Sequence, residues 1–382
     1  MKIIVFCNSS FSISGIRLGL QNIASLLAAR GHEVDYVAVP THPLDFLSPV
    51  RRPSCVRAWL RGGDKVPVVV AERLREYFLR APYSRSRKYW WSKRQVRLYT
   101  ALAPRWMIET RYDACIRDTA MSGLFADRVR ARVRILRLND NPDGLTSHIH
   151  PMVVEHLTDQ ITSHTFAEIW STTEGLSEKV KALNDAVPVV RIPNGVFLER
   201  FDAIRPAPRS PRSAVYLGTF NEWVDLDLLM ETAGHLEDWQ IDLYGPYKRR
   251  LRSLAACRNI TYRGSLPFER IPETLSKYRV GLIPFAGSGK ILETVDPLKA
   301  NEYLAAGLGI ASTSHGHLGA GLREFARFGN DPASFAAAVT TADQDCVNIR
   351  EREMVKAHLE SVSWNAITDV VEERLRRLSA EG

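Results

Sequence analysis

Lys299 is the residue whose position first suggests chemistry, because it would lie in the first turn of a helix. The segment 296–307 begins with a good N-cap residue, Asp296, followed by Pro297 at the first helical position. It ends with Gly307, which suits the left-handed turn after a helix. A helix dipole disfavours a cation in the first turn, so Lys299 is explained if a phosphate binds there. Lys299 could instead pair with Asp296, which would leave the segment as scaffold only.

The elements around this helix form a parallel crossover unit. An apolar run at 280–285 precedes the helix and the run 309–312 follows it, which predicts strand, long loop, helix and strand. Glu302 lies one turn after Lys299, and its carboxylate could accept hydrogen bonds from a ribose.

Two glycines follow predicted strands in the same half of the chain. Gly218 follows the strand 214–217, and Gly245 follows the strand 240–244. Glycine permits a close approach of the backbone to a ligand, but it is also a common turn residue. Both interpretations of these glycines are open from the sequence.

The composition is that of an ordinary water-soluble protein with two domains. The chain has 382 residues, 45% of them hydrophobic and 25% charged, and no apolar run long enough to span a bilayer. The first residues predict a strand and not a signal peptide, and the five cysteines have no metal or redox spacing. We therefore expect a cytoplasmic protein without a bound metal or other cofactor. The net charge of +8 predicts an anionic partner.

Alternating strands and helices predict two α/β domains. The first, residues 1–202, opens with the strand 2–8 and lacks the G-x-G-x-x-G of a dinucleotide site. Three prolines mark residues 203–213 as a linker, and the alternation restarts in residues 214–362. Residues 363–382 contain a final helix.

A stretch between residues 73 and 106 mixes basic and aromatic side chains. Arginine and lysine attract anionic lipid, and tryptophan and tyrosine prefer the membrane interface, so the stretch predicts contact with an anionic membrane surface. Proteins that bind single-stranded nucleic acid have a similar mixture, and an amphipathic helix pair packed on the domain is a third interpretation. The residues are Arg73, Arg75, Tyr77, Phe78, Arg80, Tyr83, Arg85, Arg87, Lys88, Tyr89, Trp90, Trp91, Lys93, Arg94, Arg97, Tyr99, Arg105 and Trp106.

The run from Pro297 to Gly307 resembles the nucleotide-sugar-binding segment of bacterial GT-B glycosyltransferases. It is most similar to the group that contains the glucuronosyltransferase of xanthan assembly, and the similarity is clearest from about Arg137 onward. The resemblance implies an α/β protein of the GT-B fold, with two Rossmann-like doubly wound domains and an interdomain cleft. It also implies that the last helix crosses back to the first domain.

The resemblance also implies a donor site in the second domain. In that family the lysine contacts the diphosphate, and the residue three positions later contacts the nucleoside. The sequence Gly-Thr-Phe at 218–220 looks like the family's Gly-Ser-Met, whose third residue packs near the uracil. The implied donor-binding residues are Gly218, Phe220, Gly245, Leu298, Lys299 and Glu302.

The pair Arg137 and Asp140 matches an Arg-x-x-Asp of the family, whose aspartate is the catalytic base. Asp140 follows the predicted strand 133–138, so it could also be a turn residue that caps the next helix, and Asp143 is a rival carboxylate. Many retaining members have Glu-x7-Glu ending at the position of Glu302, but Thr294 stands at the first position here. The sequence therefore favours inversion.

We therefore expect an inverting transfer from a nucleotide-sugar, a UDP-sugar such as UDP-glucuronate, in the synthesis of bacterial exopolysaccharide or cell-surface glycan. The expected acceptor is a lipid-linked saccharide or polysaccharide at the inner face of the cell membrane, where the protein would be peripheral. No nucleic-acid partner is expected. Two alternatives stay open: a sugar-nucleotide epimerase of the same fold, and a non-catalytic basic protein that binds lipid or nucleic acid.

Overall fold

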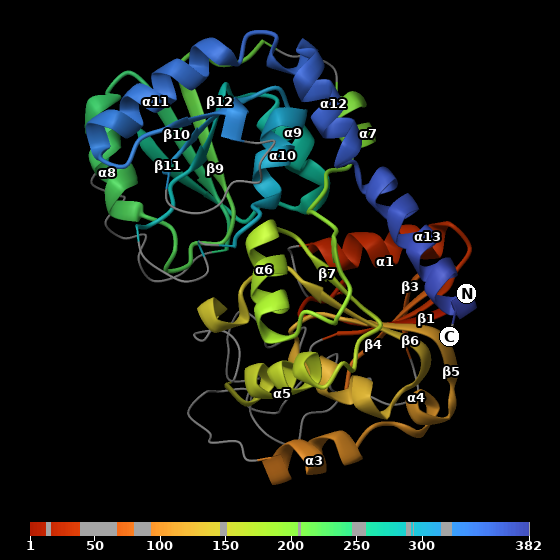
Figure 1. Cartoon of the computed structure of the whole chain (residues 1–382). Coiled ribbons are helices and arrows are strands. Elements are labelled where there is room, and N and C mark those ends of the chain that lie inside the picture. The colour runs from red at the N-terminus through yellow and green to blue at the C-terminus, as the bar shows by residue number, and fades with distance from the viewer. Residues whose placement is uncertain are drawn as a thin grey trace. The chain divides into compact units, whose positions relative to one another are not determined.

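The structure is a computed structural model that describes residues 1–12, 17–38, 67–79, 93–145, 151–204, 208–246, 257–287, 292, 294–314 and 323–381. It divides into two compact units (Figure 1). The first unit consists of Met1–Pro193 and Ile367–Gly382, and the second of Asn194–Ala366. Both units are α/β, as the alternation in the sequence predicts.

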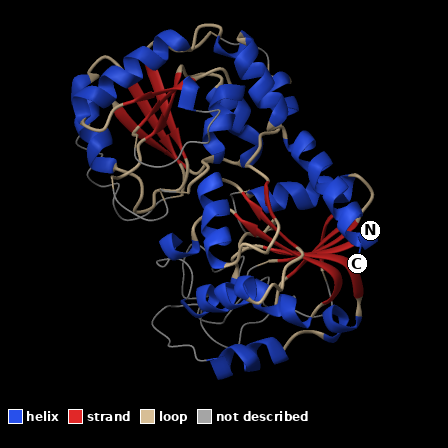
Figure 2. Cartoon of the chain, viewed as in Figure 1, coloured by secondary structure: helices blue, strands red, loops and turns tan. Residues whose placement is uncertain are grey.

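A largely parallel sheet forms the centre of the first unit (Figure 2). Its strand order is β3-β4-β2-β1-β5-β6-β7-β8. Only the edge strand β3 pairs antiparallel, with β4. Apart from β3, successive strands are added outward on one side of β1 and then on the other side, beginning with β5, which is the arrangement of a doubly wound sheet. The strands are β1 Lys2–Phe6, β2 Glu33–Val37, β3 Val68–Ala71, β4 Leu74–Tyr77, β5 Arg111–Arg117, β6 Arg130–Leu138, β7 Glu168–Ser171 and β8 Val189–Arg191.

Helices cover both faces of this sheet (Figure 1). Side chains alternate along a strand, so Ile4 and Phe6 of β1 pack with α3, α4 and η2, while Ile3 and Val5 face the other side. The helices of the first unit are α1 Gly19–Ala29, α3 Lys93–Ala101, α4 Arg105–Glu109, η2 Met121–Arg128, η3 Pro142–Leu145, α5 Pro151–Thr162, α6 Glu174–Leu183 and, from Ile367 onward, α13 Trp364–Glu381.

Buried charge fixes the last helix, α13, on the first unit. Glu168 of β7 is 1% exposed, and its Oε2 accepts hydrogen bonds from Trp170 Nε1 at 2.6 Å and Arg374 Nε at 3.1 Å. Arg377 donates to the other carboxylate oxygen at 3.4 Å. A buried carboxylate needs such partners, so α13 completes the sheet's polar interior.

The second unit has a six-stranded parallel sheet in the order β11-β10-β9-β12-β13-β14. This is the Rossmann order, in which the direction of growth reverses between β9 and β12. The strands are β9 Ser213–Leu217, β10 Gln240–Tyr244, β11 Ile260–Gly264, β12 Val280–Ile283, β13 Gly309–Ser312 and β14 Ala326–Phe328. The helices are α7 Leu198–Asp202, α8 Leu226–His235, η5 Phe268–Arg270, α9 Ile271–Leu275, α10 Leu298–Ala305, η6 Arg323–Phe325, α11 Pro332–Asp345, η7 Ile349–Glu351 and α12 Glu353–Ser361.

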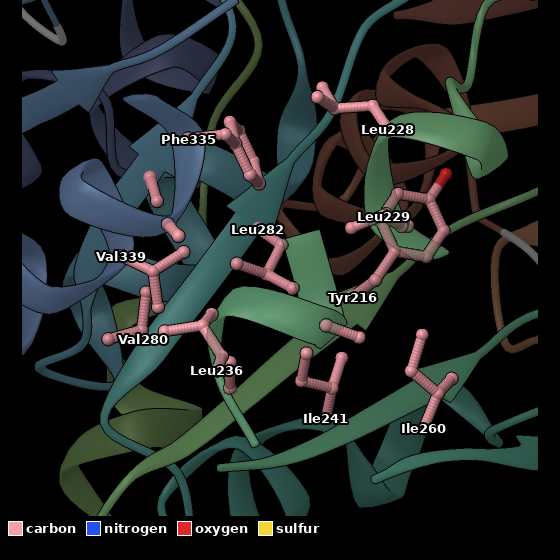
Figure 3. Close-up of a cluster of buried hydrophobic side chains, with 14 of the residues drawn as sticks. Tyr216, Leu228, Leu229, Leu236, Ile241, Ile260, Val280, Leu282, Phe335 and Val339 are labelled. Atoms are coloured by element: carbon pink, nitrogen blue, oxygen red, sulfur yellow. The ribbon is translucent and has the colours of Figure 1, made fainter. Parts of the chain in front are cut away.

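The apolar core of the second unit lies between this sheet and the helices α8 and α11. Tyr216, Ile241 and Leu282 of three neighbouring strands pack in one cluster with Leu229 and Phe335 (Figure 3). The other face of the sheet meets α10, where Tyr303 packs on Gly281 of β12. A β-carbon at 281 would lie 2.2 Å from the Tyr303 ring, so this packing requires glycine.

The border between the units differs from the predicted linker at 203–213. Asn194 already belongs to the second unit, because its backbone N–H donates to the Asp296 carboxylate at 2.8 Å. Val196 then bridges to Ser363, which joins the two ends of this unit. The first unit therefore ends at Pro193 rather than at residue 202, and the second continues to Ala366 rather than to residue 362.

Other local predictions also change. The strand Leu74–Tyr77 occupies a part of the basic and aromatic stretch that could have been a helix pair, and it is buried between β2 and β3 in the sheet. The short strand Ala326–Phe328 was not predicted either. Among the described helices, none combines the length and the apolar composition needed to cross a bilayer.

Candidate functional site

The predicted donor residues of the second unit gather at one edge of its sheet. Gly218 follows β9, Gly245 follows β10, and the loop that leads to α10 follows β12. The strands β9 and β12 are the neighbours at which the strand order reverses. Ligands of doubly wound sheets bind outside the carboxyl ends of the strands at this point. The sheet therefore brings these residues to its expected binding edge.

Gly218 and Gly245 are required for the close approach of two strand ends. Their φ angles are 151° and 152°, values that favour glycine. A β-carbon on Gly245 would lie 1.8 Å from the Gly218 carbonyl oxygen, and one on Gly218 would lie 2.7 Å from Lys299 Nζ. The two glycines thus allow the ends of β9 and β10 to approach each other and the Lys299 ammonium to approach Gly218. A simple turn would not require either approach.

The helix α10 begins at Leu298, one residue later than the predicted start at Pro297. Its N-cap is Pro297, so the expected N-cap role of Asp296 is wrong. Asp296 is instead buried, and its carboxylate and its backbone carbonyl both accept hydrogen bonds from Asn194, at 2.8 Å each. Gly307 has a φ of 74° and ends the helix as predicted.

Lys299 lies in the first turn of α10 with its ammonium over an aromatic ring. The distance from Nζ to the centroid of the Tyr216 ring is 4.1 Å. Lys299 keeps part of its surface exposed, yet burial around the ammonium lowers its pKa to about 7, while the charge of Glu302 acts in the opposite direction. The ammonium is therefore weakly hydrated and gains from an anionic ligand.

Glu302 is one turn further along α10 and titrates in the same range. Burial raises its pKa to about 7, and the positive charges of Arg200 and Lys299 oppose this rise. Arg200 itself lies over the Phe268 ring, at 3.8 Å from the centroid, and donates to the Phe268 carbonyl. The carboxylate is thus influenced by the positive charges of two nearby cations in a partly dehydrated site.

Tyr303 ties α10 to the sheet directly beneath the site. Its hydroxyl accepts the backbone N–H of Leu217, at the end of β9, at 2.9 Å, and donates to the carbonyl of Leu282 in β12 at 3.4 Å. These are the two neighbouring strands at which the strand order reverses, the switch point of the sheet. The helix is therefore held in register with the strand end that carries Gly218.

A row of buried amides fixes the other side of α10. Asn301 donates to the Asn194 carbonyl at 3.1 Å, and its Oδ1 lies 2.9 Å from His358 Nε2 of α12. Burial lowers the pKa of His358, which favours its neutral form at this contact. The row continues through Asn194 to Asp296, so the start of α10 is held from two directions.

Phe220 and Leu298 complete the predicted donor set. Phe220 is 4% exposed, and its ring centroid lies 4.9 Å from that of Tyr216 and 6.1 Å from that of Tyr262. Leu298 is half-buried at the start of α10. Both lie beside the edge that carries Lys299, and their contact with a nucleoside stays a prediction.

Asp140 lies in the first unit, just beyond β6, and is half-buried. Arg137 near the end of β6 is fully buried and donates to the side chain of Asn139. The turn that follows is closed by Asn141, whose Oδ1 accepts a hydrogen bond from the backbone N–H of Asp143 at 3.2 Å. Asp143 is exposed. The position of Asp140 at a strand end fits a base, and its role stays a prediction.

The basic and aromatic stretch is only partly described, because residues 80–92 lie outside the described ranges. Several of its aromatic residues belong to the interior of the first unit: Tyr99 is fully buried, and Tyr77 stacks on Trp106 with 4.1 Å between ring centroids. Leu98 and Leu102, by contrast, are 51% and 52% exposed. These aromatic side chains therefore pack within the first unit, Tyr99 and Trp106 from helices and Tyr77 from a strand, and membrane contact by the exposed side of α3 stays a prediction.

Three residues that contact or support the predicted donor residues were not predicted from the sequence: Tyr216, Asn194 and His358. Tyr216 reads as an ordinary residue of a buried strand, and Asn194 as a turn former before Gly195. His358 follows Lys299 by more than fifty residues, and no local pattern connects the two. Side chains alternate along a strand, so the sequence of β9 predicts only that Tyr216 lies on the same face as Ala214, toward α8. It does not predict the contact with Lys299.

No protein-family model matches the sequence, and no curated protein matches it either. Solved structures match it over nearly its whole length. Sucrose-phosphate synthase from Thermosynechococcus elongatus superposes with a TM-score of 0.72 at 14% identity, over 100% of both chains. HepE from Anabaena, solved in complex with UDP, gives 0.64 at 10% identity, over 99% of this chain and 100% of HepE. WaaG, a glycosyltransferase involved in lipopolysaccharide biosynthesis, gives 0.65 at 12% identity, over 97% of this chain and 99% of WaaG.

These neighbours are GT-B glycosyltransferases with two Rossmann-like domains, and this chain has the same fold. The prediction of the fold from the sequence is thereby confirmed. The narrower resemblance to the xanthan-type glucuronosyltransferases stays a prediction, because identities of this size establish architecture alone.

Proposed function

We propose that the protein is a glycosyltransferase that moves a sugar from a UDP-sugar to an acceptor hydroxyl. The observation that carries the proposal is the position of the Lys299 ammonium, which lies against Gly218 at the switch point of a Rossmann sheet. A partly buried cation in the first turn of a helix, beside the free N–H groups of that turn, is suited to an anionic group such as a diphosphate.

The choice of UDP rests on the resemblance and on a neighbour of the same fold. HepE was solved with UDP, and the sequence 218–220 resembles the segment that packs near uracil in the xanthan-type enzymes. Glu302 would accept hydrogen bonds from the ribose. UDP-glucuronate is the first donor to test, because the xanthan-type resemblance names that sugar.

The proposed transfer inverts the anomeric carbon. Asp140 would take the proton of the acceptor hydroxyl while the hydroxyl oxygen attacks the anomeric carbon. The bond from the anomeric carbon to the diphosphate would break on the opposite side of that carbon. Thr294, at the position of the first glutamate in many retaining enzymes, is fully buried and has no carboxylate. The negative charge that develops on the diphosphate would be stabilised by Lys299 and by the first N–H groups of α10, so we expect no metal requirement.

The proposed acceptor is a lipid-linked saccharide at an anionic membrane surface. The side chains of Arg94 and Leu98 on α3, and of Leu102 one residue after that helix, recur every four residues and are all exposed. Arg97 and Arg105 are exposed beside them. An apolar pair surrounded by arginines matches the chemistry of an anionic lipid surface.

The proposal is tested first by calorimetric titration with UDP, GDP and their sugars. We expect UDP to bind and GDP to bind more weakly, and the absence of any nucleotide binding would refute the proposal. Incubation with a UDP-sugar alone separates a transferase from an epimerase, because only an epimerase converts the sugar without an acceptor.

The base is tested with the pair Asp140→Asn and Asp143→Asn. We expect Asp140→Asn to lose about 10²- to 10⁴-fold in turnover at unchanged UDP affinity, and Asp143→Asn to lose far less. The product should have the anomeric configuration opposite to that of the donor. An active Asp140→Asn enzyme, or a product that keeps the donor's configuration in proton NMR, would overturn the assignment.

The membrane partner is tested by co-sedimentation with phosphatidylglycerol vesicles. The double variant Leu98→Ser and Leu102→Ser should bind them less, and added salt should weaken wild-type binding. Leu183→Ser is the matched control, since Leu183 is 47% exposed on a different helix of the same unit. Binding that neither the double variant nor salt reduces would exclude this surface.

A further inference from the structure

The ring of Tyr216 is held rigidly beneath the Lys299 ammonium. Tyr216 is 1% exposed and belongs to the apolar cluster between β9 and α8 (Figure 3). Its hydroxyl donates to the Thr219 carbonyl at 3.1 Å, and its ring packs against Phe220. Because the ring is held at both ends, it can act as a fixed platform for the flexible lysine.

An ammonium that left this ring would have a competing partner nearby. Glu302 is one helical turn away, and its negative charge already acts on Lys299. An ion pair with Glu302 would neutralise the ammonium and take it from Gly218. A tyrosine face attracts a cation through its quadrupole without neutralising it, so the full positive charge stays available to a ligand.

We infer that Tyr216 is a positioning residue of the donor site, which holds the Lys299 ammonium against Gly218 for the diphosphate and keeps it from Glu302. This inference rests on the proposed function, because it assumes that a nucleoside diphosphate is the ligand. It adds a residue outside the motif that contains Lys299. It also explains why an aromatic side chain lies beside a lysine near the end of β9.

The experiment compares UDP with uridine, which has the same base and ribose but no phosphate. We expect Tyr216→Phe to bind UDP within about twofold of wild type, because the ring remains. Tyr216→Leu should bind UDP about tenfold more weakly, the size of a partly desolvated cation–π contact, and should bind uridine as wild type does. In a Lys299→Met background, Tyr216→Leu should cause no further loss, since the contact is already absent.

Three results would overturn the inference: unchanged UDP affinity in Tyr216→Leu, an equal loss for UDP and uridine, or a loss that persists in the Lys299→Met background. The second and third would mean that Tyr216 only supports the fold. If Tyr216→Leu does not fold, a trifluorinated phenylalanine at 216 replaces it, because fluorine weakens the ring's attraction for cations while its shape is kept. It should then bind UDP more weakly than Tyr216→Phe, and equal affinity would refute the inference. Failure of wild type to bind UDP would instead refute the proposed function.

Discussion

Replacement of Lys299 by methionine should remove ligand affinity and at the same time stabilise the protein. Methionine has nearly the same length and can lie over the Tyr216 ring, where Lys299 Nζ is 4.1 Å from the centroid. The substitution therefore removes the charge while the packing is largely kept. Affinity and stability are expected to change in opposite directions, which a purely structural lysine would not produce.

The loss of affinity is that of a hydrogen bond to a charged group, about 1.5–3 kcal/mol. At 1.4 kcal/mol for each factor of ten, UDP should bind about 10- to 150-fold more weakly to Lys299→Met. Uridine affinity should be unchanged, because the nucleoside contacts are proposed to come from Glu302 and Phe220.

The gain in stability follows from the lowered pKa of Lys299. Burial lowers this pKa to about 7 in the folded protein, while an unfolded lysine titrates near 10.4. The unfolded chain therefore binds the proton more tightly, and the charged lysine opposes folding in full below pH 7. The cost declines as the pH rises from 7 and disappears above about 10.4. A shift of this size in a fully buried group would be worth more than about 4 kcal/mol, but Lys299 keeps part of its surface exposed and solvent screens its charge. We therefore expect Lys299→Met to gain about 1–2 kcal/mol at pH 7 and nothing at pH 11.

Thermal unfolding at pH 6, 7, 9 and 11 measures this gain, and the Tm should rise by a few degrees at the two lower values. Wild-type UDP affinity should also fall between pH 7 and 9, while that of Lys299→Met stays level. Glu302→Gln is the control, because the pKa of Glu302 is also about 7. A Lys299→Met protein that binds UDP normally, or that is less stable than wild type at pH 7, would refute the reasoning.

Two further substitutions test the packing around the site and the last helix. Gly245→Ala should lose about 2–4 kcal/mol of unfolding free energy in urea, because its β-carbon would lie 1.8 Å from the Gly218 carbonyl, whereas the exposed helical Gly234→Ala, whose β-carbon meets nothing within 4 Å, should lose nothing. Equal effects would show that the strand ends can move apart. Glu168→Gln should lose about 2 kcal/mol, because the buried side chain loses the charge that strengthens its hydrogen bonds from Arg374 and Trp170. Arg377→Ala should lose less than about 1 kcal/mol, because the Arg377 side chain is 54% exposed. A harmless Glu168→Gln would mean that α13 is held by apolar contacts alone.

The sequence predicts most of the architecture because buried parallel strands are short apolar runs bounded by turn residues. The strands that contain Ile4 and Leu282 are of this kind, and both are where the pattern places them. The strand Leu74–Tyr77 is not, since Arg75 and Glu76 interrupt it. Its pairing with β2 is long-range, and no local pattern specifies such a contact.

The site was predictable to the extent that one helix contains it. The order of residues from Leu298 to Gly307 fixes where Lys299 and Glu302 stand relative to each other, because helical spacing is regular. The cap was predicted wrongly because Asp296 has a stronger tertiary partner in Asn194 than in its own helix. The Tyr216 ring beneath the ammonium depends on how β9 and α10 meet, which spacing along the chain does not encode.

The second unit is an insertion within the first, and this bears on the order in which the protein forms during synthesis. Its two ends are joined where Val196 bonds to Val362 and Trp364, at 3.0 and 2.9 Å. It is one continuous stretch, Asn194–Ala366, so all of it leaves the ribosome before the part of α13 that belongs to the first unit, from Ile367 onward. The first unit, though it begins earlier, lacks the arginine partners of Glu168 until Arg374 and Arg377 have been added. The unit translated second is therefore the one able to fold first, and the unit translated first waits for the last residues of the chain.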